Sequence, residues 1–193
     1  SLVGMGGAPR AAILMGKKDN DGAEEVLGNS VFFLFLLSIV LCAVFYFTKD
    51  PILMLFGASS QTLPYASQYL GIYLAGTLSV QIALGLNQFI SCQGFAKTSM
   101  MTVLIGAVLN IILDPIFIFV LDMGVAGAAL ATVIGQMISA VWVVQFLVGK
   151  KAVIRLKKSC IKLDRKITKN IFLLGTSNFI MQGTNCAVQI VCN

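Results

Sequence analysis

The sequence predicts an all-α, polytopic transmembrane helical bundle, and three observations support this fold class. Of the 193 residues, 58% are hydrophobic and only 11% are charged, whereas soluble domains carry about 25% charged residues. The apolar residues form runs long enough to cross a bilayer, and the basic residues gather in alternate connections between these runs. The mean hydropathy of +0.90 excludes a soluble enzyme or a nucleic-acid-binding domain, so lipid is the predicted solvent of most of the surface.

Five apolar runs are long enough to be membrane spans, because a crossing helix needs about 20 mostly apolar residues. In order, they cover residues 30–48, 65–92, 98–121, 123–149 and 170–193. Residues 1–16 are interpreted as the end of an earlier helix that leads into a loop. The expected bundle therefore contains five spans and the last part of a sixth helix.

Local signals support the individual runs. Pro51 follows the expected outer boundary of the first run, and the second run lies in a stretch without charge between Asp50 and Lys97. The third run carries one acid, Asp114. The fourth begins with small residues around Gly124, which let membrane helices approach each other closely.

The basic residues predict the orientation of the spans, because loops on the cytoplasmic side are enriched in Lys and Arg. Loops 16–29, 93–99 and 149–169, with Arg10 added, carry thirteen of the fourteen basic residues, and the alternate loops carry only Lys49. These three loops are therefore predicted to be cytoplasmic and to face anionic lipid headgroups. A nucleic-acid-binding patch is a poor alternative for residues 150–169, since they lie between two spans and lack interleaved aromatic residues.

The chain starts at Ser1 without a Met and ends inside an apolar run, so it is expected to be an internal fragment of a longer protein. Five Cys residues show no CxxC spacing, which argues against a disulfide framework. His is absent, which removes the commonest metal ligand. No nucleophile, zinc or nucleotide-binding motif is present, so neither an enzyme nor a bound cofactor is expected.

Asp114 is the acid that the sequence singles out. The other seven acids lie in loops or at span edges and are interpreted as solvated charges, whereas Asp114 follows sixteen uncharged residues. A carboxylate within a membrane span must be neutral, paired or exposed to a polar cavity. Asn110 lies four residues earlier on the same helix face, and Pro115 disturbs the backbone bond to a carbonyl near Ile111.

These oxygen atoms predict a site for Na⁺ or a proton at Asp114. The alternative is that Asp114 lies at the outer membrane edge, since Asp122 is only about 12 Å further along the helix. In the next span, Thr132 lies four residues before Gln136. A lone Thr in a membrane helix usually bonds its own backbone, so spacing alone does not give Thr132 a function.

The last run carries a stripe of amides on one helix face, at Asn178, Gln182, Asn185 and Gln189. An amide that faces lipid would lack hydrogen-bond partners at a cost of several kcal/mol. The stripe is therefore expected to face either a wet cavity or neighbouring helices. The amides of the second run, Gln81, Asn87 and Gln88, are interpreted as packing residues.

The residues from Asn110 to Thr132, NIILDPIFIFVLDMGVAGAALAT, strongly resemble the MATE (multidrug and toxic compound extrusion) transporters. GMGGAPR at 4–10 and GKKDNDGAE at 16–24 resemble the family segment after its second helix. The resemblance implies twelve helices in two lobes, with part of the N-terminal lobe at 1–148, the inter-lobe link at 149–169 and the truncated first helix of the C-terminal lobe at 170–193. It further implies a monomeric protein of the bacterial plasma membrane.

The same resemblance implies efflux of drug-like cationic or amphipathic molecules, driven by Na⁺ or H⁺. Asn110, Asp114 and Thr132 match three residues of the family's cation site, whose fourth ligand, an Asp of helix one, lies outside this chain. Some members carry an acid in helix seven, where this chain has Gln182. The remaining alternatives are a flippase for lipid-linked oligosaccharide of the same superfamily and a non-transporting membrane protein.

Overall fold

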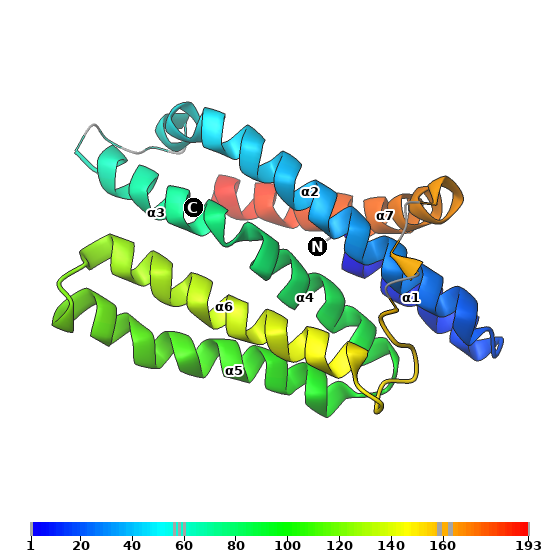
Figure 1. Cartoon of the computed structure of the whole chain (residues 1–193). Helices are drawn as coiled ribbons and strands as arrows, with labels where there is room; N and C mark the ends of the chain where they lie inside the picture. Colours follow the sequence, from blue (N-terminus) through cyan, green and yellow to red (C-terminus); the bar gives the residue numbers. More distant parts are fainter. Residues whose placement is uncertain are drawn as a thin grey trace.

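The computed structural model describes residues 2–55, 57, 59, 61–157, 160–161 and 164–192, and within these residues it contains helices and no strand. Figure 1 shows the helices as an elongated bundle in which successive long elements run back and forth. This confirms the predicted fold class. The elements are α1 (Leu2–Gly16), α2 (Asn20–Leu55), α3 (Leu63–Ala75), α4 (Thr77–Cys92), α5 (Ala96–Pro115), the π-helical turn η1 (Ile116–Val120), α6 (Gly124–Val148) and α7 (Arg165–Cys192).

Three connections meet at one end of the bundle, at the right of Figure 1, which we call the basic end. They are the α1–α2 turn, the α4–α5 turn and the link from α6 to α7. Oε1 of Gln93 in the α4–α5 turn accepts hydrogen bonds from the backbone N–H groups of Val153 (2.8 Å) and Ile154 (3.1 Å) in the link. Oε1 of Glu24, at the start of α2, accepts one from Arg155 N (3.0 Å). The prediction that these loops share one side of the bundle is confirmed.

Small residues set the closest helix contacts. A Cβ added to Gly6 of α1 would overlap the carbonyl oxygen of Ile171 in α7, and one on Gly4 would lie 2.6 Å from the carbonyl oxygen of Gly85 in α4. A Cβ on Gly135 of α6 would lie 3.2 Å from the carbonyl oxygen of Gly106 in α5. These positions therefore hold α1, α5 and α6 at backbone contact with their neighbours, as is usual in membrane bundles.

The expected second span is wrong in one respect, because residues 65–92 do not form a single straight helix. The chain bends by 57° between α3 and α4, at Gly76. A Cβ at this position would lie 2.6 Å from a methyl group of Val133 in α6. The two helices together still have the length and composition of one broken span.

The other expected spans agree with the helices in part. By length and apolar composition, α2, α5 with η1, and α6 can each cross a membrane. Pro51 does not end the first span as predicted, since α2 continues through it to Leu55. The last run begins earlier than expected, at Arg165, and α7 is not among the helices of the described chain that are apolar enough to cross a membrane. Its amides account for this lower hydropathy.

The surface of the spans is apolar, as lipid contact requires. Phe47, Ile111 and Phe119 are 82%, 71% and 80% exposed, so large side chains point away from the bundle. The core lies toward the basic end, where Leu27, Leu34 and other buried residues of α1, α2, α4, α6, the link and α7 pack together. This core joins α1, α2, α4, α6, the link and α7 at the basic end.

Candidate functional site

Asn110 of α5 and Thr132 of α6 meet across the interface of these two helices. Nδ2 of Asn110 donates a hydrogen bond to Oγ1 of Thr132 at 3.1 Å, and the Thr132 hydroxyl in turn donates to the carbonyl oxygen of Ala128 at 3.0 Å. Thr132 thus makes the backbone bond expected of a lone Thr and also contacts Asn110. Because Nδ2 points to Thr132, the Oδ1 atom of Asn110 keeps its lone pairs for another partner.

Asp114 lies one helical turn beyond Asn110 on the same face of α5. Its side chain is half-buried, and its Oδ1 atom is buried without a hydrogen-bond partner. A buried carboxylate oxygen without a partner is costly unless it is protonated or bound to a cation. One oxygen of the Asp114 carboxylate is therefore shielded from solvent, while the depth of Asp114 in the membrane stays a prediction.

Immediately after Asp114 the helix changes its geometry. Helix α5 ends at Pro115, and residues 116–120 form the π-helical turn η1, with Leu121 N bonded to Ile116 O at 3.0 Å. A Cβ on Gly127 of α6 would lie 2.7 Å from the carbonyl oxygen of Phe117 in this turn, so η1 and α6 are in direct backbone contact. π-turns inside helices are frequent at functional sites, and sequence reasoning foresaw only the disturbance by proline.

The chemistry of this cluster suits a small hard cation or a proton. Carboxylate, amide and hydroxyl oxygens are the ligands that hard cations take in proteins. Within the described part of the chain, no three His, Cys, Asp or Glu side chains come together as a metal site. Asp114 supplies the carboxylate here, and Asn110 and Thr132 supply neutral oxygen atoms. Of the residues predicted from the sequence, Asn110 and Thr132 are in contact, and Asp114 lies one helical turn beyond Asn110 on α5.

The amide stripe of α7 is described less completely than the residues of α5 and α6. Helix α7 continues through all four positions, so they share one helix face. The side chains of Asn178 and Gln182 lie outside the described residues, while Asn185 and Gln189 are exposed. The cavity-facing role of the stripe stays a prediction.

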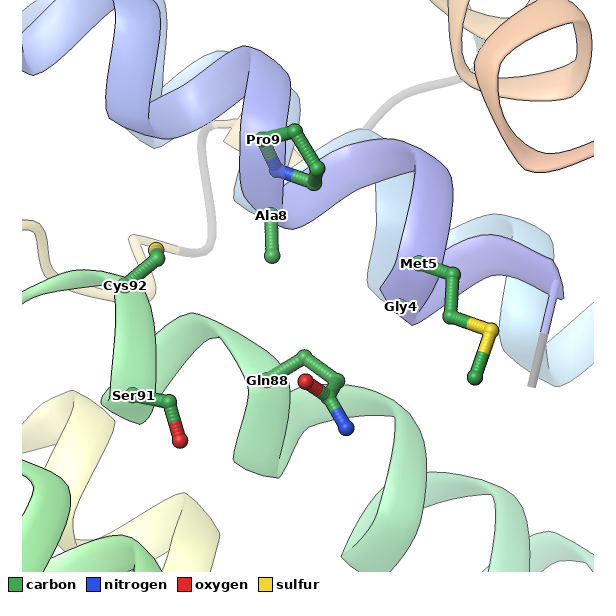
Figure 2. Close-up of a pocket in the computed structure, with 7 residues that line it drawn as sticks. All are labelled: Gly4, Met5, Ala8, Pro9, Gln88, Ser91 and Cys92. Atoms are coloured by element: carbon green, nitrogen blue, oxygen red, sulfur yellow. The ribbon is translucent and has the colours of Figure 1, made fainter. Parts of the chain in front are cut away.

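A hollow of about 430 Å³ lies between α1 and α4 and was not predicted from the sequence. Figure 2 shows Met5, Ala8 and Pro9 on α1 across from Gln88, Ser91 and Cys92 on α4. The lining is uncharged, with an amide, a hydroxyl and two sulfur atoms beside apolar carbon. It comprises Gly4, Met5, Ala8, Pro9, Gln88, Ser91 and Cys92.

Glu24 at the basic end corrects one interpretation of the sequence. Its side chain was expected to be solvated, but the residue is only 6% exposed. Besides the Arg155 N–H group, it contacts the ammonium group of Lys157 in an ion pair. The hydrogen bond to Glu24, together with its charge, raises the pKa of Lys157 above the ordinary value. Glu24 was missed because acids near a turn are usually solvated.

The long apolar helices of the described residues and the bent span define a polytopic α-helical membrane protein. The MatE family model matches residues 1–116. The multidrug export protein MepA of Staphylococcus saprophyticus is 31% identical over 181 residues, which cover 94% of this chain and 40% of that protein. The chain thus spans about 40% of the length of this curated relative.

Two solved structures have the same arrangement of helices. One is an inward-facing conformation of a multidrug resistance MATE family transporter of the MOP superfamily, with a TM-score of 0.85 at 27% identity over 91% of this chain and 40% of that chain. The other is an outward-facing conformation of such a transporter, with a TM-score of 0.84 at the same identity, over 91% of this chain and 39% of that chain. On the family match, this chain belongs to the MatE family.

Proposed function

We propose that the chain forms part of a cation-coupled efflux transporter for drug-like cationic or amphipathic molecules, with Asp114 as the residue that binds the coupling ion. The observation that carries the proposal is the buried, unpartnered Oδ1 of Asp114 beside the Asn110–Thr132 hydrogen bond. The coupling ion is Na⁺ or H⁺. A transporter needs a group that is loaded in one state and emptied in another, and a carboxylate in an otherwise apolar span meets this requirement.

Asp114 carries the charge in this proposal, and its two neighbours assist it. Asn110 and Thr132 are neutral, so each offers an oxygen ligand or orients the carboxylate without changing the charge of the site. Their hydrogen bond also ties α5 to α6 at the level of Asp114. The amide stripe of α7 and the names of the relatives support a small-molecule cargo.

The test is Asp114→Asn in the full-length protein, because the amide keeps the shape of the carboxylate but cannot bind a proton or balance a cation. We expect loss of drug resistance in cells and loss of ion-driven efflux in proteoliposomes, at an unchanged level of protein in the membrane. Asn110→Ala and Thr132→Ala should reduce efflux less, since each removes one neutral ligand.

Asp122→Asn is the matched control. Asp122 is exposed in the turn before α6 and has a positive φ of 51°, a conformation that Asn tolerates. This variant should keep full resistance. If resistance survives Asp114→Asn at normal expression, the coupling site lies elsewhere in the full-length protein.

We further propose that the protein lies in the bacterial plasma membrane with the basic end in the cytoplasm. The thirteen-to-one distribution of basic residues supports this orientation through the positive-inside rule. Val153 in the link is 50% exposed, so a cysteine at this position should react with an impermeant thiol reagent in inside-out vesicles only. Labelling in intact cells would contradict the orientation.

A further inference from the structure

A small cavity lies where α4, α5 and α6 meet, closer to the basic end than the Asp114 site. Its volume is about 60 Å³. The lining combines buried polar side chains with apolar ones, and consists of Ala83, Leu84, Asn87, Thr102, Val103, Gly106, Gln136 and Ser139. Asn87, Thr102 and Ser139 are 7%, 3% and 2% exposed, so this is a polar pocket in the interior of the bundle.

Most of the polar groups around the cavity already have partners. The Ser139 hydroxyl donates to the carbonyl oxygen of Thr102 at 3.2 Å, and the Thr102 hydroxyl donates to that of Thr98 at 3.2 Å. Nδ2 of Asn87 donates to the carbonyl oxygen of Ser99 at 3.1 Å. The Oδ1 atom of Asn87, however, is buried and has no hydrogen-bond partner.

The orientation of the Asn87 amide follows from its neighbour. A backbone carbonyl oxygen can only accept a hydrogen bond, so Nδ2 must face Ser99 and Oδ1 must face away from it. A buried acceptor without a partner costs about 1–3 kcal/mol. A hydrogen-bond donor in the adjoining cavity would therefore stabilise the Oδ1 atom of Asn87.

We propose that this cavity binds ordered water, with one water molecule donating a hydrogen bond to Oδ1 of Asn87. A buried water needs about 10–15 Å³ of such volume and typically makes two to four hydrogen bonds, so 60 Å³ is ample. Besides Asn87, the Ser139 hydroxyl oxygen can accept from the water, and the half-buried Gln136 amide lies beside it. A cation is the poorer occupant, because the lining carries no charge to balance it.

The location of the water gives it a second role, which rests on the proposed function. Gly106 precedes Asn110 by four residues, and Gln136 follows Thr132 by four, so the cavity lies one helical turn, about 6 Å, from the Asn110–Thr132 pair. On its far side, Asn87 contacts Ser99, whose Oγ accepts a hydrogen bond from Ser91 Oγ at 2.6 Å. The water thus extends a polar path from the Asp114 site toward the basic end.

The first test is the structure of the full-length transporter at a resolution that shows buried waters elsewhere in the same map. We expect solvent density within hydrogen-bond distance of Asn87 Oδ1. An empty cavity, or a protein group bonded to Oδ1, would overturn the proposal. So would a cation, recognised by shorter ligand distances and by its loss when sodium is removed.

The second test replaces Asn87, whose Oδ1 atom has no hydrogen-bond partner. Asn87→Leu should remove the density and, through the path, slow ion-driven efflux several-fold, while Leu84→Met, which keeps every polar lining group, should retain both. If Asn87→Leu removes the density but leaves efflux unchanged, the water site is correct and the proposed path is wrong. If instead Asp114→Asn retains full efflux, the proposed coupling residue is wrong and the water site is unaffected.

Discussion

The buried carboxylate of Glu24 is one of the groups that hold the link between α6 and α7 to the bundle, beside the Gln93 amide. The effect of removing this carboxylate on the docking of the link can be calculated. Glu24→Ala deletes the acceptor of the Arg155 N–H group, which lies 3.0 Å from Oε1. A hydrogen bond to a charged group contributes about 1.5–3 kcal/mol. Solvent screens the ion pair, because half of the Lys157 side chain is exposed.

Loss of that bond should raise the population of the undocked link about ten- to hundred-fold, since about 1.4 kcal/mol is a factor of ten. Trypsin cleavage after Arg155 in the detergent-solubilised, full-length protein measures this population when opening is fast relative to cleavage. Fragment masses identify the cleaved bond. Glu24→Gln and Lys157→Met keep the backbone bond and should accelerate cleavage much less.

Glu25→Ala is the matched control, because Glu25 is the next residue along α2 and is exposed. It removes the same charge from the same helix end without touching the link. Equal cleavage rates in Glu24→Ala and Glu25→Ala would refute the assignment of docking to the buried carboxylate. A Lys157→Met effect as large as that of Glu24→Ala would show that the ion pair, not the backbone bond, holds the link.

Two further predictions concern other parts of the bundle. Gly127→Ala should destabilise the protein by about 1–3 kcal/mol, since the added Cβ would overlap the Phe117 carbonyl oxygen of η1. The melting temperature of each variant measures the change in stability. Gly71→Ala is the control and should be near neutral, because its added Cβ would have no atom within 4 Å. Equal melting temperatures for the two variants would contradict the close contact. For the amide stripe, Gln182→Cys in the full-length protein should react with a water-soluble thiol reagent, and a thiol that stays unmodified would reject the cavity-facing interpretation.

The broad fold was predictable because hydropathy and charge act on whole segments. A run of apolar residues has to find lipid or a core wherever its exact ends lie, and the basic loops have to share a side. Helical spacing predicted that Asn110 and Asp114 share a face, and the resemblance to known transporters predicted that Thr132 of the next helix joins them. Both inferences use properties that hold along a single helix or between consecutive helices.

What escaped prediction depends on contacts between distant segments. The bend at Gly76 lies in a run without charged residues, and its close contact with Val133 of α6 is visible only in the structure. The burial of Glu24 depends on a link more than 130 residues later in the chain. The cavity beside Asn87 was equally hidden, since the sequence suggested packing for this amide and could not show that one of its atoms lacks a partner.

The bend between α3 and α4 also determines how movement travels through the protein. A straight helix transmits an axial push from one face of the membrane to the other, whereas two segments inclined by 57° convert much of that push into sideways displacement. Both segments pack against α6. Helix α6, which also carries Thr132, is therefore placed to couple displacements of these two inclined segments.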